Sequence, residues 1–138
     1  MSGNATRLSR LLLAYERYDA SWRKQRGFTF NERHVILVLA ESGPMSPTAL
    51  SDLIGVTTAG MTGLLDRLEA EGYLTRRRHP DDGRRVLVTP TKRSLRAHDD
   101  LLRLLETLVE EHAGADDDAV AAFLGDITRG LIRASDPD

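Results

Sequence analysis

The 138-residue sequence predicts a mostly α-helical protein with one small β-hairpin. Over most of the chain, apolar residues recur three and four positions apart, which is helical spacing. Two strand-like segments, 73–79 and 85–91, flank the Pro-Asp-Asp-Gly sequence at 80–83, whose residues favour a tight turn. Before this hairpin, two short helical segments are separated by a turn that contains glycine, a pattern typical of a helix-turn-helix. The fold class is therefore a helix-turn-helix followed by a β-hairpin wing, with helices at both ends.

Two helices are expected at the N-terminal end. Leucine and aromatic residues form one apolar stripe from Thr6 to Arg26, and Gly27 follows at the position of a helix C-cap. Thr29 and Glu32 have the spacing of a capping box, which predicts the start of a second helix. Its segment 34–40 is apolar on nearly every side, so we expect this helix to be buried.

The helix-turn-helix is expected next. Ser46 is a good N-cap residue with Pro47 at the first helical position, and Gly55 ends this short helix. The next helix is predicted over Ala59–Glu71. In a helix-turn-helix, this second helix enters the major groove of DNA.

Positive charge is concentrated in the hairpin and the residues after it. Between Thr75 and Arg96 there are eight Lys or Arg residues and two Asp, a net charge of +6 (eight minus two). The whole chain has a net charge of −2, so the remainder carries −8 (−2 minus +6). Such asymmetry is expected of a surface that contacts a polyanion, although an Arg-rich hairpin can also be merely solvated. A helix-turn-helix directly before the basic hairpin favours nucleic acid.

Two further helices are predicted, over Thr91–His112 and Ala119–Arg133. The leucine stripe of the first is broader than one partner helix requires, which predicts a homodimer. We expect a single domain, residues 1–138, with the winged helix-turn-helix at 29–91 and dimerisation helices at 5–27 and 92–135.

Several classes of protein are disfavoured. The absence of cysteine excludes disulfides, thiolate metal sites and thiol oxidation. We find no nucleophile motif, no glycine-rich phosphate loop and no paired His–carboxylate motif, so neither an enzyme nor a cofactor is expected. No apolar run approaches about 20 residues and no signal pattern is present, which predicts a cytoplasmic protein that does not contact a membrane.

The stretch from Leu50 to Thr91 resembles the winged helix-turn-helix of MarR-type transcriptional regulators. The most specific pieces are Asp66-Arg67-Leu68-Glu69, followed by Gly72, and the wing tip Asp82-Gly83-Arg84. The resemblance implies a homodimer that binds pseudo-palindromic double-stranded DNA, with Arg84 in the minor groove and Asp82 orienting it by a salt bridge. It also implies a repressor that is released by a small, often aromatic anion.

The candidate DNA-binding residues lie on the second helix of the motif and on the wing. They are Thr57, Thr58, Ala59, Thr62, Gly63, Arg67, Arg76, Arg77, Arg78, Asp82, Arg84 and Arg85. Related recognition helices often carry a cation where this chain has Gly63-Leu64. The helix therefore lacks a side chain for bidentate contact with guanine, and we expect modest discrimination through threonine and methyl contacts.

An effector pocket and a metal site are two further possibilities, and the residues of each also suit simpler roles. Tyr18, Trp22, Phe30 and His34 could line a pocket for an aromatic effector, but residues at this spacing also suit a core or a dimer interface. His34, His98 and His112 suggest a metal-responsive regulator, yet His98 and His112 would lie about 21 Å apart along one helix. They could not share an ion within one subunit. A winged-helix module that binds protein is the other alternative to a DNA-binding regulator.

Overall fold

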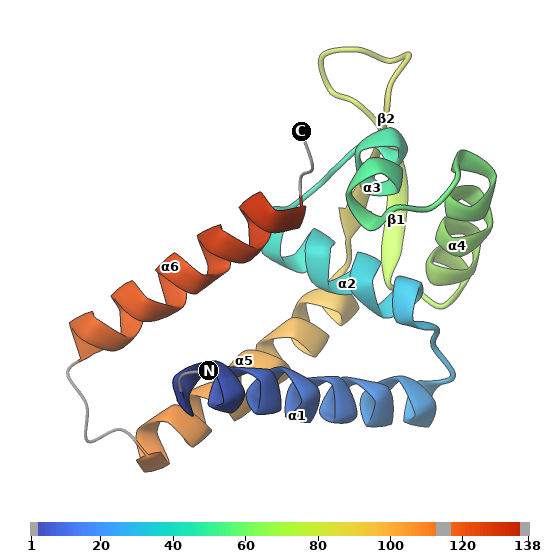
Figure 1. Ribbon diagram of the computed structural model, residues 1–138. Coiled ribbons are helices and arrows are strands. Elements are labelled where there is room, and N and C mark those ends of the chain that lie inside the picture. Colours follow the sequence, from blue (N-terminus) through green and yellow to red (C-terminus); the bar gives the residue numbers. More distant parts are fainter. Residues whose placement is uncertain (1–2, 113–116, 136–138) are drawn as a thin grey trace. The chain divides into compact units, whose positions relative to one another are not determined.

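The computed structural model describes residues 3–112 and 117–135 (Figure 1). The elements in chain order are α1 (Gly3–Arg26), α2 (Phe30–Ser42), α3 (Pro47–Ile54), α4 (Thr58–Ala70), β1 (Leu74–Arg78), β2 (Val86–Pro90), α5 (Lys92–His112) and α6 (Asp117–Ser135). The predicted fold class is confirmed, because the chain is mostly helical with one antiparallel hairpin after a helix-turn-helix. The chain forms two compact units, Met1–Leu101 and Leu102–Asp138.

The predicted helix caps of α2 and α3 are present. The Thr29 side chain accepts a hydrogen bond from the Glu32 N–H at 3.2 Å, and its hydroxyl donates to Glu32 Oε1 at 3.0 Å. Ser46 accepts from the Ala49 N–H at 3.1 Å. Gly55 ends α3 in the left-handed conformation, with φ of 77°, which a residue with a side chain rarely adopts.

The recognition helix α4 begins one residue earlier than predicted. The Thr57 side chain accepts a hydrogen bond from the Gly60 N–H at 3.1 Å, so Thr57 is the N-cap and Thr58 is the first helical residue. One face of α4 is buried through Met61, Leu65 and Leu68. The helix thus begins and ends one residue before the predicted bounds, and its buried residues follow helical spacing.

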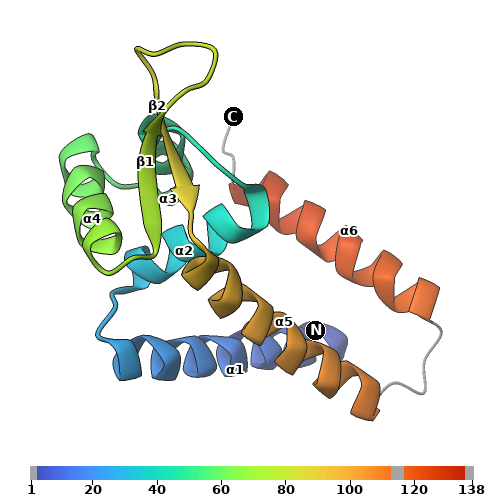
Figure 2. The same cartoon turned by 180° about the vertical axis from the view of Figure 1, so that it is seen from behind.

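The hairpin pairs Leu74 with Pro90 at its base and Arg78 with Val86 near its tip. The loop between β1 and β2 extends beyond α3 and α4 when the molecule is seen from either side (Figures 1 and 2). One further pairing was not predicted, since Met45 forms an isolated bridge with Val88. Its N–H donates to the Val88 carbonyl at 3.0 Å, and the Val88 N–H donates back at 2.7 Å. The wing is thereby attached to the segment that leads into α3.

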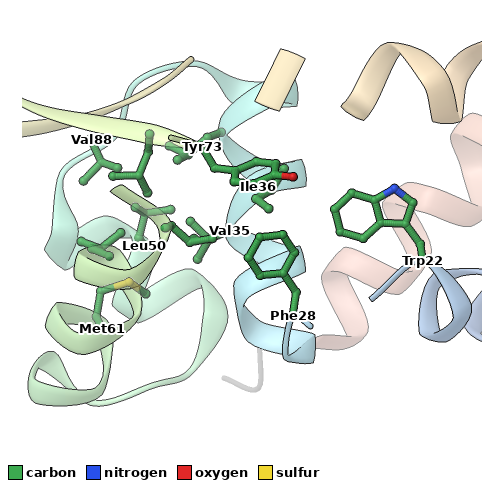
Figure 3. Close-up of a cluster of buried hydrophobic side chains, with 12 residues drawn as sticks. Trp22, Phe28, Val35, Ile36, Leu50, Met61, Tyr73 and Val88 are labelled. Carbon is green, nitrogen blue, oxygen red and sulfur yellow. The ribbon is translucent and has the colours of Figure 1, made fainter. Parts of the chain in front are cut away.

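The core of the first unit joins α1, α2, the helix-turn-helix and the hairpin (Figure 3). Trp22 stacks on Phe28 with ring centroids 5.9 Å apart, and Phe28 meets Tyr73 edge-on at 5.0 Å. Val88 is fully buried in this core, whereas Val86, two residues nearer the wing tip, is 40% exposed. The hairpin is therefore anchored at its base and open to solvent at its tip.

Candidate nucleic-acid interface and ligand cleft

The outer face of α4 consists of small and hydroxylated residues. All five predicted contact residues here are exposed: Thr57, Thr58, Ala59, Thr62 and Gly63. The Thr62 hydroxyl donates to the Thr58 carbonyl at 3.1 Å, and the Thr57 hydroxyl oxygen caps the helix. A Cβ added at Gly63 would meet nothing within 4 Å, so the surface is open at this position.

Four arginines form an exposed group on the wing, which we call the wing cations: Arg77, Arg78, Arg84 and Arg85. Within residues 3–112 and 117–135, their side chains make no hydrogen bond and no ion pair. Arg84 and Arg85 also line a groove of about 500 Å³ against the start of α3, Ser46 to Ala49. Four exposed guanidinium groups with unused donors, on the hairpin that follows α4, suit a polyanion.

The salt bridge expected between Asp82 and Arg84 is not formed among the described residues. Asp82 Oδ1 instead accepts a hydrogen bond from the backbone N–H of Arg84 at 3.1 Å. The Asp82 carbonyl accepts from the Arg85 N–H at 3.0 Å, so Asp82 shapes the turn through its side chain and its backbone. The carboxylate fixes the loop and leaves the Arg84 guanidinium exposed.

Arg76 was predicted to contact DNA, but its guanidinium is bound within the protein. Its Nη2 lies 2.6 Å from Asp66 Oδ1, and its Nε lies 2.8 Å from Glu69 Oε2. Asp66 of α4 thus pairs with an arginine of the wing. The hydrogen bonds to Asp66 and Glu69 raise the pKa of Arg76 above its usual value. This residue therefore attaches β1 to α4, because both of its acidic partners lie on α4.

Arg67 was also predicted to contact DNA, and its guanidinium too has partners within the protein. Its Nη1 donates to Glu32 Oε1 at 2.7 Å, and its Nη2 donates to the Gly27 carbonyl at 2.5 Å. The guanidinium also lies 5.6 Å from the centre of the Phe28 ring. Arg67 therefore faces the α1–α2 connection, where its donors already have partners.

A cleft of about 410 Å³ lies in the first unit, bounded by α1, α2, α3 and the start of α5. It is lined by Tyr15, Glu16, Asp19, Phe30, Arg33, His34, Leu37, Val38, Glu41, Ser42, Leu53, His98 and Leu101. Phe30 and His34 line it, as predicted, but Tyr18 and Trp22 do not. Trp22 is only 8% exposed and belongs to the core, because it stacks on Phe28.

Arg33 is the principal residue of this cleft that sequence reasoning missed. It is 1% exposed, and its Nε donates to Asp19 Oδ1 at 2.9 Å. Its Nη1 and Nη2 are buried without a hydrogen-bond partner among the described residues. The guanidinium lies 3.8 Å from the centre of the Trp22 ring. Nη1 and Nη2 together carry four N–H groups, and once a side-chain movement opens them to the cleft they can receive a carboxylate in a bidentate manner.

Two of the three histidines considered for metal line this same cleft. His98 Nε2 lies 2.9 Å from Glu41 Oε2, and His34 packs edge-on against Phe30. Among the residues that the structure describes, no group of three or more His, Asp or Glu side chains could hold a metal ion. The side chain of His112 lies outside the described part of the chain.

The comparison with known families agrees with this geometry. The model of the MarR family matches residues 26–85, from the end of α1 to the wing tip. The chain belongs to the MarR family.

An HTH-type transcriptional regulator of Bacillus subtilis, YcgE, is 35% identical over 92 residues, which are 64% of this chain and 60% of that protein. The HTH-type transcriptional repressor YetL of the same bacterium is 28% identical over 112 residues, which are 77% of this chain and 67% of that protein. The MarR-family chain thus spans about two thirds of the length of these relatives.

Solved structures show the same fold over nearly the whole chain. Transcriptional regulator Tm0710 from Thermotoga maritima superposes with a TM-score of 0.66 at 22% identity, covering 99% of this chain and 100% of its own. Streptococcus pneumoniae FabT, solved in complex with DNA, gives a TM-score of 0.65 at 23% identity, covering 95% and 97%. In the described part of this MarR-family chain, no helix is long and apolar enough to cross a membrane.

Proposed function

We propose that this MarR-family chain is a transcriptional regulator that binds double-stranded DNA through α4 and the wing. The observation that carries the proposal is the group of four wing cations, which are exposed and whose side chains have no partner among the described residues. In this arrangement α4 enters the major groove and Arg84 enters the adjacent minor groove. The DNA complex of the structurally similar FabT supports the assignment.

The proposed active form is a homodimer on a pseudo-palindromic site. α1 exposes Leu11, Leu12 and Leu13 by 58%, 49% and 63% of their surface. The second unit exposes its own apolar residues, among them Leu102, Leu105, Phe123 and Ile132. Exposed apolar patches on helices are a frequent sign of an oligomer interface, and burying them yields about 25 cal/mol per Å².

We further propose that the protein is a repressor released by a small carboxylate with an apolar body. The cleft is mostly apolar, and it contains one buried guanidinium whose Nη1 and Nη2 have no partner among the described residues. A carboxylate at these atoms would satisfy them, while a ring or chain would pack against Leu37 and Val38. Repression is supported by the relative YetL, which is named a repressor.

DNA binding is tested by selecting duplexes from a random pool with the purified wild-type chain. We expect enrichment of a pseudo-palindrome, with thymine-rich half-sites because α4 offers only hydroxyl and methyl groups. Recovery of no common sequence, together with no affinity for the pool at low salt, would favour the protein-interaction module instead.

The effector site is tested separately by titrating sodium benzoate while recording the fluorescence of Trp22, the only tryptophan of the chain. Because Trp22 lies against Arg33, an anion at Arg33 should change its emission. Benzyl alcohol has the same ring without the charge and should have no effect, and Arg33→Met should abolish the response to benzoate. An equal response to both compounds would refute a carboxylate site.

A further inference from the structure

We infer that Arg67 is a positioning residue for DNA binding, which acts through Glu32 and does not contact phosphate. The inference rests on the proposed function, because it concerns how α4 is held for DNA. Asp66 and Arg67 are adjacent on α4 but face different parts of the protein: Asp66 binds Arg76 of the wing, whereas Arg67 binds Glu32 and Gly27. Two attachments, one to the wing and one to the α1–α2 connection, thus hold the last turns of α4.

The Arg67–Glu32 ion pair joins α4 to the first turn of α2. Glu32 Oε1 accepts two hydrogen bonds, from Arg67 Nη1 at 2.7 Å and from the Thr29 hydroxyl at 3.0 Å. Thr29 is in turn the N-cap of α2. The same guanidinium binds the Gly27 carbonyl at the end of α1. One side chain therefore ties the end of α4 to the connection between α1 and α2.

The acid of this ion pair is buried, although the Arg67 side chain is 46% exposed. The Glu32 side chain is 6% exposed, and its Oε2 is buried without a partner in the described structure. Without Arg67, the carboxylate would keep only the Thr29 hydroxyl. A buried charge that loses its counter-charge must regain water or move, unlike an exposed pair, which contributes little. Loss of Arg67 should therefore shift or loosen the end of α4.

A small displacement at this end is amplified at the other. α4 has 13 residues and is about 20 Å long at 1.5 Å per residue. A tilt of about 5° at its C-terminal end moves the N-terminal end by about 1.7 Å, more than the spread of hydrogen-bond distances. The outer-face residues from Thr57 to Gly63 lie toward that N-terminal end. Arg67 can thus control their placement without contacting DNA.

The test compares Arg67→Met, Glu32→Gln and the double variant with the matched control Arg77→Met, which removes an unpaired wing cation. Affinity for a selected duplex is measured by fluorescence anisotropy over a range of salt. We expect Arg67→Met to weaken binding about ten-fold with an unchanged salt slope, whereas Arg77→Met should reduce the slope by about two, because a homodimer loses two phosphate contacts. Glu32→Gln should weaken binding as Arg67→Met does. The double variant should lose no more affinity for the duplex than the single variant that binds more weakly.

Two results would overturn the inference. One is a reduced salt slope in Arg67→Met that matches the Arg77→Met control. The other is undiminished affinity in Glu32→Gln, since a phosphate-contacting Arg67 would not need its internal partner.

Hydrogen exchange of the free protein decides the same question without DNA. Backbone amides in the last turn of α4 should exchange at least ten-fold faster in Arg67→Met and Glu32→Gln than in the control, and unchanged protection would overturn the inference. If the wild type bound no duplex at any salt concentration, the proposed function would fail, while hydrogen exchange would still decide whether Arg67 holds α4.

Discussion

The buried pair of Asp19 and Arg33 predicts an asymmetric response to mutation. Asp19 accepts hydrogen bonds from Arg33 at 2.9 Å and from Arg23 at 3.0 Å, so it has two cationic partners. Arg33 has one carboxylate partner and two buried nitrogen atoms without partners among the described residues. Removing the acid therefore leaves a buried charge alone, whereas removing the base leaves the acid paired.

The magnitudes follow from these contacts. Asp19→Asn should lower the free energy of unfolding by about 3 kcal/mol, the low end for breaking a buried pair, because the Asn carbonyl can still accept a hydrogen bond. Arg33→Met loses a cation–π contact with Trp22 worth up to about 2 kcal/mol. It also removes two unsatisfied donors, whose burial costs about 1–3 kcal/mol each. The variant also loses the hydrogen bond to Asp19, worth about 1.5–3 kcal/mol. Losses of about 3.5–5 kcal/mol therefore oppose a gain of about 2–6 kcal/mol, and the net change for Arg33→Met should be small compared with the loss for Asp19→Asn.

Urea denaturation followed by Trp22 fluorescence at fixed protein concentration measures this difference. We expect the midpoint of Asp19→Asn to fall further than that of Arg33→Met, with the same m-value for both. The double variant should be more stable than Asp19→Asn alone, because it no longer contains an unpaired buried cation. Equal losses from the two single variants, or a double variant less stable than Asp19→Asn, would refute this account of the cleft.

Three further predictions concern the interface and the assembly. Arg84→Ala should weaken binding most on duplexes with A·T-rich flanks, because their narrow minor groove attracts arginine. Arg77→Ala should weaken binding to all duplexes alike. If anisotropy showed that both variants lose affinity independently of the flanks, the assignment of Arg84 to the minor groove would be contradicted. Leu12→Glu, which places a charge on the exposed face of α1, should yield monomers in light scattering at micromolar concentration, and an unchanged dimer would exclude this face from the interface. Gly63→Arg should improve binding to guanine-containing half-sites by about 1–3 kcal/mol, because a Cβ added at this position meets no described atom within 4 Å. Unchanged preference in a competition assay would show that this position does not face the bases.

Local signals in the sequence predicted the helices and the hairpin. Thr29, Ser46 and Gly55 act on backbone groups within a few residues, so their effect can be recognised from spacing alone. The start of α4 was predicted one residue late, at Ala59, because two threonines precede it and either could cap the helix. The Met45–Val88 bridge could not be predicted, since its partners are far apart in the sequence and one of them is a lone residue outside any strand pattern.

The site was predicted only in part, because the charge of a side chain does not reveal which group it pairs with in the folded protein. Arg67 and Arg76 have the composition of a DNA-binding surface, yet their guanidinium groups bind Glu32, Asp66 and Glu69. Arg33 precedes an apolar helical run and carries the charge of a surface residue, but folding buries it against Asp19. The position of this arginine, directly before an apolar helical segment, is the sequence signal that could have indicated the cleft.

The salt dependence of DNA binding by the intact chain tests the central claim most directly. Four wing cations per protomer place eight in a homodimer, so the slope of log K against log salt should lie between about −4 and −7. Replacing all four by glutamine should bring the slope close to zero while the helical content stays unchanged. A slope that is equally steep in the wild type and this variant, or no affinity of the wild type for any duplex at low salt, would contradict the account.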